Sequence, residues 1–242
     1  MKPVLFISDL HLAAERPEIN EAFFDFLARE ARQAAALYIL GDLFEYWAGD
    51  DDLDDPLHGA VAGGLRRLTA SGVPVDVIPG NRDFLLGKRF EAATGARLLG
   101  DLALLNLFGI TTLIMHGDTL CTDDTRYQAY RATVRKPWLQ TLYFALPRSV
   151  RQRIVGGIRG HSRQVTSAKR PEIMDVNHAA VADALRSHGY PRLIHGHTHR
   201  PACHRHEVDG HPCERWVLDA WYDGGDFLTV GPDGIERRRV GA

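Results

Sequence analysis

Two histidines separated by one residue suggest a metal-binding site. His197 and His199 lie in the run Gly196-His197-Thr198-His199. Shortly before it, the lead-in Pro191-Arg192-Leu193 predicts a buried strand. In an extended chain, side chains two residues apart point to the same face, so both imidazoles can reach one ion. Imidazole is a common metal ligand, and a neighbouring glycine lets another group approach the backbone closely. On its own, so short a motif is more often a solvated turn than a metal site.

Four further segments place metal-competent side chains directly after apolar runs. With the first pair they make three oxygen ligands and four imidazoles without any thiolate: Asp9, His11, Asp42, Asn81, His116, His197 and His199. Nitrogen and oxygen donors of this kind bind manganese, iron, cobalt or zinc. Because the arrangement recurs after one apolar run after another, it predicts a metal site rather than a coincidence.

The apolar runs indicate the elements that must position these side chains. Four-residue runs predict strands buried on both faces at Val4–Ile7, Leu37–Leu40 and Val75–Ile78. Helical spacing predicts helices over Ile19–Gln33, Leu57–Ala70 and Asn177–His188. Hairpins are predicted at 102–115 and 202–218. Ligands gather at the carboxyl ends of strands in open α/β sheets, so we expect an α/β fold with the metal site at those ends.

The overall composition excludes several classes of protein. The chain has 242 residues and a formal net charge of −2, so no global attraction to nucleic acid or anionic lipid is expected. Three scattered cysteines do not make a disulfide framework and favour a reducing compartment. The N-terminal apolar run is too short for a signal peptide and no run could span a bilayer, so a cytosolic location is expected. The acidic run Asp50–Asp55 is expected to be a solvated, self-repelling turn.

The segment from Thr125 to Pro171 interrupts the alternation of strands and ligands. It contains eleven Lys or Arg residues and no Asp or Glu, interleaved with aromatic and aliphatic side chains. Pro137 and Pro147 predict helices joined by turns. Such a segment can bind nucleic acid, or it can cover acyl chains and rest on anionic headgroups. The aliphatic run Trp138–Leu146 favours lipid over bases, and an ordinary helical hairpin with a solvated basic face is the third interpretation.

Several of these motifs resemble the calcineurin-like metallophosphoesterase family. They are Asp9-x-His11, Gly41-Asp42, Gly80-Asn81-Arg82-Asp83, His116-Gly117-Asp118 and Gly196-His197-Thr198-His199. The resemblance implies a two-sheet αββα sandwich with the active site at the strand ends. It also implies a single domain over residues 1–242, with a helical, lipid-binding insert at about 125–170.

Longer runs resemble the branch of this family that acts in lipid A biosynthesis. They are Tyr38–Glu45, Gly80–Lys88, Met115–Asp124 and Ile173–Asn177. The branch implies that metal-activated water attacks the α-phosphorus of UDP-2,3-diacylglucosamine and releases UMP and 2,3-diacylglucosamine 1-phosphate. It also implies two divalent ions, with manganese as the metal, and a lipid-linked UDP-sugar as the substrate. The expected location is cytoplasmic, with peripheral association at the anionic inner membrane and no nucleic-acid partner.

The resemblance assigns roles to individual residues. One metal is implied to be held by Asp9, His11, Asp42 and His199, and the other by Asp42, Asn81, His116 and His197, so that Asp42 bridges the two. Catalytic roles are implied for Asn81, Arg82 and His116. Substrate binding is implied for Asn81, Arg82, Asp124, Ser162, Thr166, Lys169 and His197.

The sequence departs from the family pattern at two positions. Arg82 replaces a histidine that is usual in the wider family, although it matches the lipid A branch. An arginine cannot act as a general acid at neutral pH, but it can bind a phosphate through two hydrogen bonds and stabilise developing charge. Asp219 stands where the resemblance leads us to expect a glycine, which puts the local turn in question.

Two other functions stay open on the sequence. A soluble phosphodiesterase or nucleotide phosphatase could use the same metals, but it would not need the basic, apolar segment. A non-catalytic protein that binds membranes or nucleic acid would be expected to have lost metal ligands, and none of the seven positions is missing.

Overall fold

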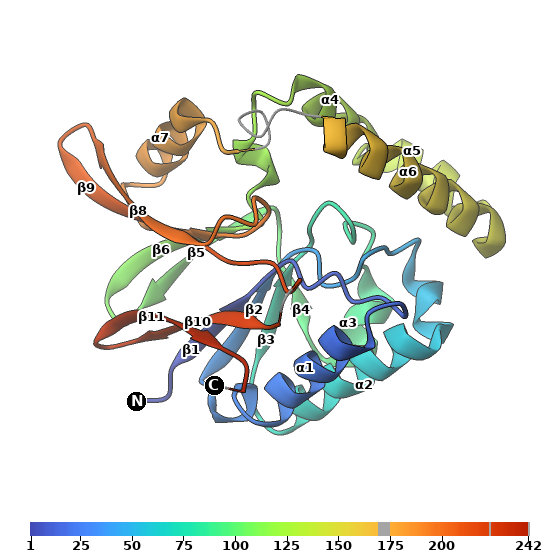
Figure 1. The fold of residues 1–242 in the computed structure, drawn as a ribbon, viewed down its shortest axis with the longest axis horizontal. Coiled ribbons are helices and arrows are strands. Elements are labelled where there is room, and N and C mark those ends of the chain that lie inside the picture. The colour runs from blue at the N-terminus through green and yellow to red at the C-terminus, as the bar shows by residue number, and fades with distance from the viewer. Residues whose placement is uncertain (169–174, 223, 242) are drawn as a thin grey trace.

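Two β-sheets pack face to face, and helices cover their outer sides (Figure 1). The computed structural model describes residues 1–168, 175–222 and 224–241, with side chains described outside 159–168. The predicted α/β sandwich of two sheets is therefore confirmed.

The first sheet contains the strands that precede Asp9, Asp42 and Asn81. Its six strands lie in the order β11-β10-β1-β2-β3-β4. β1 to β4 run parallel, and β10 pairs antiparallel with β1 and β11. The bounds are β1 Val4–Ile7, β2 Ala36–Leu40, β3 Val75–Ile78, β4 Arg97–Leu98, β10 Asp226–Gly231 and β11 Gly234–Arg239.

The second sheet contains the strands that end near His116, His197 and His199. Its five strands lie in the order β5-β6-β7-β9-β8. β6, β7 and β9 are parallel neighbours, and β5 and β8 pair antiparallel at the two edges. The bounds are β5 Leu102–Leu107, β6 Ile110–Met115, β7 Arg192–His195, β8 Ala202–Val208 and β9 His211–Val217.

Three apolar layers hold the sandwich together. Phe6 and Leu40 of the first sheet pack with Ile114 and Ile194 of the second in the layer between the sheets. Helices α1 (Pro17–Ala28), α2 (Pro56–Ala70) and α3 (Lys88–Thr94) cover the outer face of the first sheet. Helix α7 (His178–Ser187) covers the second sheet. The four residues of β1 are all buried, which explains their continuous apolar run.

Most of the predicted elements are confirmed, with differences at their ends. The helix predicted to reach Gln33 ends at Ala28 and is followed by a short 3₁₀ turn over Ala31–Gln33. Both predicted hairpins are present as β5–β6 and β8–β9. The sequence analysis did not predict α3, β4, β10 or β11.

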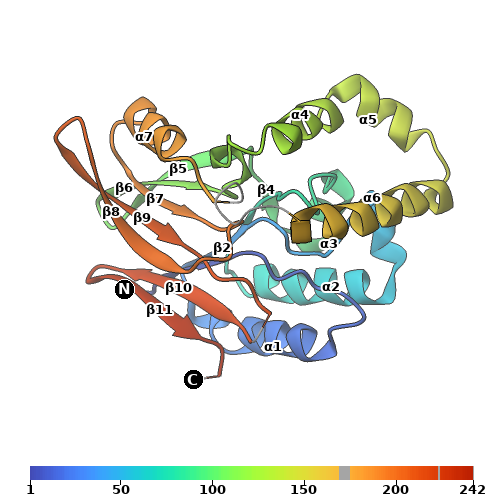
Figure 2. The same cartoon turned by 45° about the horizontal axis from the view of Figure 1, so that its top comes forward.

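Three helices form an arm that projects from the sandwich (Figures 1 and 2). They are α4 (Thr125–Val134), α5 (Pro137–Phe144) and α6 (Arg148–Ala168), and we call them the insert. Pro137 begins α5 and Pro147 precedes α6, as expected for residues that start helices or end them. The side chains of α5 are exposed or half-buried, with none fully buried.

The acidic run at Asp50–Asp55 is not a solvated turn, and that expectation is wrong. Asp50 accepts hydrogen bonds from the backbone N–H groups of Gly87 and Arg89 at the start of α3. Asp52 is fully buried and accepts from the backbone N–H of Ala48. Asp55 is the N-cap of α2. The carboxylates therefore satisfy backbone donors at element ends instead of repelling one another in water.

The same acidic run anchors the insert. Nε of Arg148 in α6 lies 3.3 Å from Oδ1 of Asp52. Arg151, also in α6, forms an ion pair with Asp51 and donates a hydrogen bond to the carbonyl oxygen of Ala48. The basic character of the insert is thus partly neutralised by the sandwich. Its exposed cations without an ion pair to any described residue are Arg126, Lys136 and Arg153.

Candidate metal centre

The seven metal-competent residues form one continuous cluster at the strand ends. Asp9 and His11 follow β1, Asp42 follows β2, Asn81 follows β3, His116 follows β6, and His197 and His199 follow β7. The cluster lies where the carboxyl ends of neighbouring parallel strands meet, as predicted.

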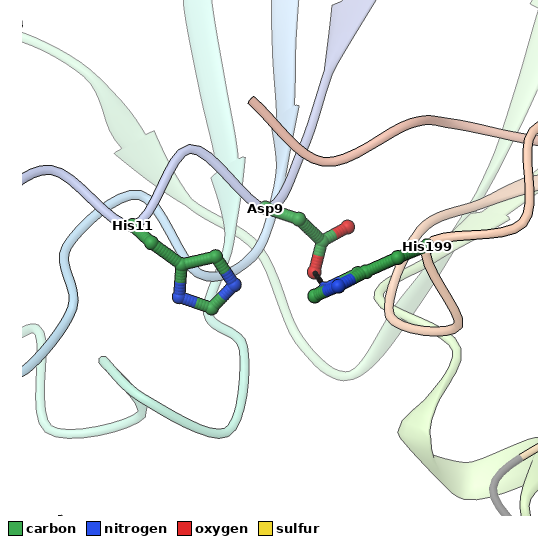
Figure 3. A group of neighbouring side chains, drawn as sticks. All are labelled: Asp9, His11 and His199. Atoms are coloured by element: carbon green, nitrogen blue, oxygen red, sulfur yellow. Dashed lines mark hydrogen bonds and ion pairs between the residues drawn. The ribbon is translucent and has the colours of Figure 1, made fainter. Parts of the chain in front are cut away.

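The first half of the cluster contains Asp9, His11 and His199, whose ligand atoms lie within 4.8 Å of one another (Figure 3). Nε2 of His199 lies 3.3 Å from Oδ1 of Asp9. Nε2 of His11 faces Oδ2 of Asp42 at 3.8 Å. Nδ1 of the buried His11 lies 3.1 Å from Oε2 of Glu45.

The second half is built around His116. Its Nε2 lies 3.0 Å from Oδ1 of Asn81, 3.2 Å from Nδ1 of His197 and 3.8 Å from Oδ1 of Asp42. Asp42 therefore directs Oδ2 toward the first half and Oδ1 toward the second. Asp9, Asp42 and His116 also bring ligand atoms within 4.8 Å of one another. This is an arrangement in which one carboxylate can bridge two cations.

The hydrogen bond to Leu40 selects the tautomer of His116. Nδ1 lies 2.8 Å from the carbonyl oxygen of Leu40, and because a carbonyl can only accept, Nδ1 carries the proton. In the neutral ring, Nε2 then presents a lone pair toward the cluster. Nε2 and the Asn81 oxygen are both acceptors in that state, and a cation between such groups satisfies both. The residues present therefore fit a divalent metal.

Backbone strain is concentrated at the same residues. Five of the eight described non-glycine residues with positive φ belong to the cluster: Asp9, His11, Asp42, His197 and His199. Each such conformation costs roughly 1–3 kcal/mol and persists only where the surroundings enforce it. A Cβ at Gly80 would lie 2.2 Å from Oδ1 of Asp42, and one at Gly41 would lie 2.4 Å from Nδ1 of His116. The glycines of the Gly41-Asp42 and Gly80-Asn81 motifs thus allow the loop after β2 and the loop after β3 to pack in direct contact.

The carboxylates create a field that favours cations. Burial lowers the pKa of His116, but the nearby charges of Asp42, Asp9 and Asp118 outweigh it and raise the pKa to about 9. Burial and the neighbouring His116 instead lower the pKa of His197 to about 4. A proton on His116 therefore occupies, in the absence of metal, a position that a divalent ion competes for.

Buried carboxylate Asp83 fixes the loops that carry two of the ligands. It accepts hydrogen bonds from the backbone N–H groups of Leu43 and Phe44 in one loop and of Gly80 in the other. Burial and the charge of Asp42 raise the pKa of Asp83 to about 6. The Gly-Asn-Arg-Asp motif therefore supplies a structural brace as well as a ligand.

Arg82 connects the cluster to a cavity. Its backbone N–H donates to Oδ1 of Asp42 at 2.8 Å, and its buried Nε has no hydrogen-bond partner among the described residues. The cavity has a volume of about 260 Å³ and lies between the insert and the loops after β2 and β3. Its polar lining residues are Glu45, Asn81, Arg82 and Gln140. The other lining residues are aromatic or aliphatic: Tyr46, Trp47, Phe84, Leu85, Tyr130, Val134, Leu139, Tyr143, Ile154, Val155 and Ile158.

The predicted substrate residues outside this cavity are placed differently. Asp124 is the N-cap of α4 and accepts from the backbone N–H of Tyr127 at 3.1 Å, so its carboxylate has a structural task. The predictions for the side chains of Ser162 and Thr166, and for Lys169 altogether, lie outside the described residues. Asp219 has no positive φ, so the fold does not require the expected glycine there.

Sequence analysis missed two residues that border the centre. Asp118 accepts from the hydroxyl of Tyr127 at 2.6 Å and pairs with Arg131, which ties the insert to the His116 loop. Tyr222 packs against the rings of His11 and His199. Asp118 belongs to the His116-Gly117-Asp118 motif, so the sequence signals that it lies near the ligand His116. Nothing in the sequence near Tyr222 signals its position.

The chain is similar to known phosphoesterases. The model of the family described as calcineurin-like phosphoesterase matches residues 2–201, which include all seven cluster residues. The UDP-2,3-diacylglucosamine hydrolase of Escherichia coli O7:K1 (strain IAI39 / ExPEC) is 55% identical over 232 residues, or 96% of each chain. The protein of the same name from Escherichia coli O17:K52:H18 (strain UMN026 / ExPEC) is 54% identical over the same share.

Proposed function

The chain belongs to the calcineurin-like phosphoesterase family, and from this premise we propose that it hydrolyses the pyrophosphate bond of UDP-2,3-diacylglucosamine. The products are UMP and 2,3-diacylglucosamine 1-phosphate. The observation that carries the proposal is the position of the cavity. Its apolar walls begin at Asn81 and Arg82, so acyl chains can lie in it while the diphosphate lies at the metal centre.

The cluster residues would hold two divalent cations, and we propose manganese. Asp9, His11, Asp42 and His199 would hold one, and Asp42, Asn81, His116 and His197 the other, with Asp42 shared. When bound, such cations lower the pKa of the attacking water and offset the charge of the phosphoryl oxygens. Asn81 supplies a neutral oxygen, so it adds a ligand without another negative charge facing an anionic substrate.

The reaction breaks the bond between the α-phosphorus and the bridging oxygen. Water adds to the α-phosphorus, and the bridging oxygen leaves with the lipid as part of a phosphate monoester. Arg82 has donors at the polar end of the cavity, where it can bind the leaving phosphate through two hydrogen bonds and stabilise its growing charge. The apolar walls exclude water from the sugar–lipid side.

The outer surface of the insert supports a role at a membrane. Trp138 and Leu142 are each 60% exposed, and Phe144 is 45% exposed. Arg126, Lys136 and Arg153 are exposed cations of the same arm. Exposed apolar groups with flanking cations favour peripheral binding to an anionic surface. No helix among the described residues is long and apolar enough to cross a membrane.

Hydrolysis in ¹⁸O-labelled water tests both the substrate and the point of attack. Attack on the α-phosphorus predicts that the label appears in UMP and not in 2,3-diacylglucosamine 1-phosphate. Label in the lipid product would show attack on the β-phosphorus. Turnover of a soluble phosphodiester without any turnover of the lipid substrate would support the alternative of a general phosphodiesterase.

A further inference from the structure

Tyr222 presents an exposed aromatic ring beside the metal centre. Its ring stacks on His11, with centroids 5.8 Å apart and planes inclined by 7°, and meets His199 edge-on at 5.3 Å and 64°. Nevertheless, 55% of Tyr222 is exposed. Among the exposed large hydrophobic residues that the structure describes, it is the one whose ring contacts a candidate metal ligand.

The backbone beneath Tyr222 is firmly held. Trp221 is fully buried, its backbone N–H donates to the carbonyl of Asp9, and its indole N–H donates to the carbonyl of Asp226. Arg16 donates to the carbonyl of Trp221 at 2.6 Å and places its guanidinium carbon 4.9 Å from the centroid of the Tyr222 ring. The buried, hydrogen-bonded Trp221 therefore fixes the position of the exposed Tyr222 ring.

A purely supporting role for Tyr222 does not explain its exposure. A ring that served only to orient His11 and His199 would gain more by being buried against them. Its hydroxyl makes no hydrogen bond to any described residue. Tyr127, which lies 6.1 Å from the ring of His197, is different because its hydroxyl is engaged by Asp118.

The Tyr222 ring lies outside the lining of the apolar cavity. Neither Tyr222 nor Arg16 lines the apolar cavity beyond Asn81 and Arg82. A nucleoside diphosphate lipid carries its acyl chains on one side of the diphosphate and its nucleoside on the other. If the acyl chains occupy the cavity, the Tyr222 ring is an aromatic surface still available for a planar base.

We propose that Tyr222, supported by Arg16, forms the subsite for the nucleobase of the substrate. This inference rests on the proposed function, because it takes the nucleoside to be part of the substrate. The base stacks on the exposed part of the ring, and the free hydroxyl can bond to the ribose or base. Stacking tolerates any base, since every base has a π-face, so the subsite recognises nucleoside monophosphates as a class.

Binding of UMP to the manganese-loaded protein tests the subsite by calorimetry. Tyr222→Ala should weaken UMP binding by roughly ten-fold, the scale of one lost stacking contact, while Tyr222→Phe keeps most of the affinity. Inorganic phosphate should bind Tyr222→Ala as it binds the unchanged protein, because it has no base. Tyr190→Ala is the matched control, since Tyr190 stacks on His211 at 4.0 Å outside the cluster.

Two results would overturn the subsite. The first is unchanged UMP affinity in Tyr222→Ala, and the second is an equal loss for UMP and phosphate, which would assign the ring to supporting the metal ligands. The hydrolysis assay separates this proposal from the proposed function. If the lipid substrate is hydrolysed but UMP binding ignores Tyr222, only the subsite fails. If UMP binding needs Tyr222 but the lipid substrate is not hydrolysed, the subsite stands and the proposed function fails.

Discussion

Nε of Arg131 lies 2.7 Å from Oδ2 of Asp118, and this ion pair joins α4 of the insert to the loop that carries His116. Both side chains are largely buried, with 15% and 4% of their surfaces exposed. Tyr127, one turn earlier in α4, donates to the same carboxylate oxygen. The part of the insert that lines the cavity is therefore joined directly to the metal centre.

The connection continues to the neighbouring ligand loop. Arg131 also pairs with Asp101 at 3.0 Å, and Arg135 pairs with the same carboxylate at 2.7 Å. Arg135 further donates to the carbonyl of Gly80, directly before Asn81. One face of α4 thus contacts both loops of the second half of the metal centre, while Tyr130 and Val134 line the cavity.

Replacing Asp118 with asparagine should destabilise this junction. Asp118→Asn removes the more deeply buried of the two carboxylates that pair with Arg131 and leaves only Asp101 as an ionic partner. The variant should therefore lower the free energy of unfolding by about 2 kcal/mol, the scale of a lost hydrogen bond to a charged group. Urea unfolding measures this change. The matched control is Asp183→Asn on the exposed pair with Arg186, which should have no measurable effect. Equal effects of both variants would contradict the structural role of the Asp118 pair.

The contribution of Asp118 should depend on pH with a definite sign. Burial alone would raise the pKa of Asp118, but the charges of His116, His197 and Arg131 outweigh it, and the pKa is lowered. A carboxyl group whose pKa is lowered by folding contributes its full stabilisation at any pH above its pKa in the unfolded chain, which is near 4. This stabilisation is lost as the pH falls below that value. The stability difference between the unchanged protein and Asp118→Asn should therefore shrink in acid. A difference that grows below pH 4 would show that the sign is wrong.

Chelation should abolish hydrolysis and leave the fold intact. The candidate ligands are nitrogen and oxygen groups at loop ends, while the three apolar layers contain none of them. Circular dichroism should stay unchanged as activity disappears, and manganese should restore activity better than zinc or magnesium. Full hydrolase activity in protein shown to be free of metal would refute the two-metal site.

Asp42→Ala should be more damaging than loss of any other ligand. Its two oxygens face His11 and His116, so its removal should empty both metal positions, whereas His116→Ala should weaken chiefly one. Elemental analysis of the dialysed proteins, together with turnover, makes the comparison. Asp76→Ala, a buried carboxylate paired with Arg97, is the control that should retain both metals. Loss of one metal from each ligand variant would contradict the bridging assignment.

The positions of the metal ligands could be predicted because local patterns determine them. Val4–Ile7 must be a buried strand since it is apolar throughout, and its carboxyl end then delivers Asp9 and His11 to the sheet edge. The division of ligands between two metals came from family resemblance and not from spacing. The close packing of Gly80 against Asp42 needed coordinates.

Interactions between distant segments could not be predicted. Asp52 appeared to be one charge in a repulsive run, because its partners Arg148 and Gln152 lie on α6 and reach it only when that helix docks. Strand β10 depends on pairing with β1, more than 200 residues earlier in sequence, and the edge strand β11 depends on pairing with β10. The short polar-apolar pattern of both strands carries little local signal. Tyr222 reaches the centre only because Trp221 is buried beside α1.

Comparing Leu139→Ser with Leu142→Ser tests the central claim, that the cavity selects an acylated substrate. Both residues lie on α5, but Leu139 lines the cavity whereas Leu142 is 60% exposed. We predict that Leu139→Ser lowers kcat/KM for UDP-2,3-diacylglucosamine in detergent micelles at least ten-fold, since a polar group then faces the acyl chains. Leu139→Ser should leave a soluble phosphodiester unaffected. Leu142→Ser leaves the cavity wall unchanged, so it should lower turnover of the micellar lipid substrate less than Leu139→Ser does. Equal losses on both substrates with Leu139→Ser, or no loss on the lipid, would contradict the account.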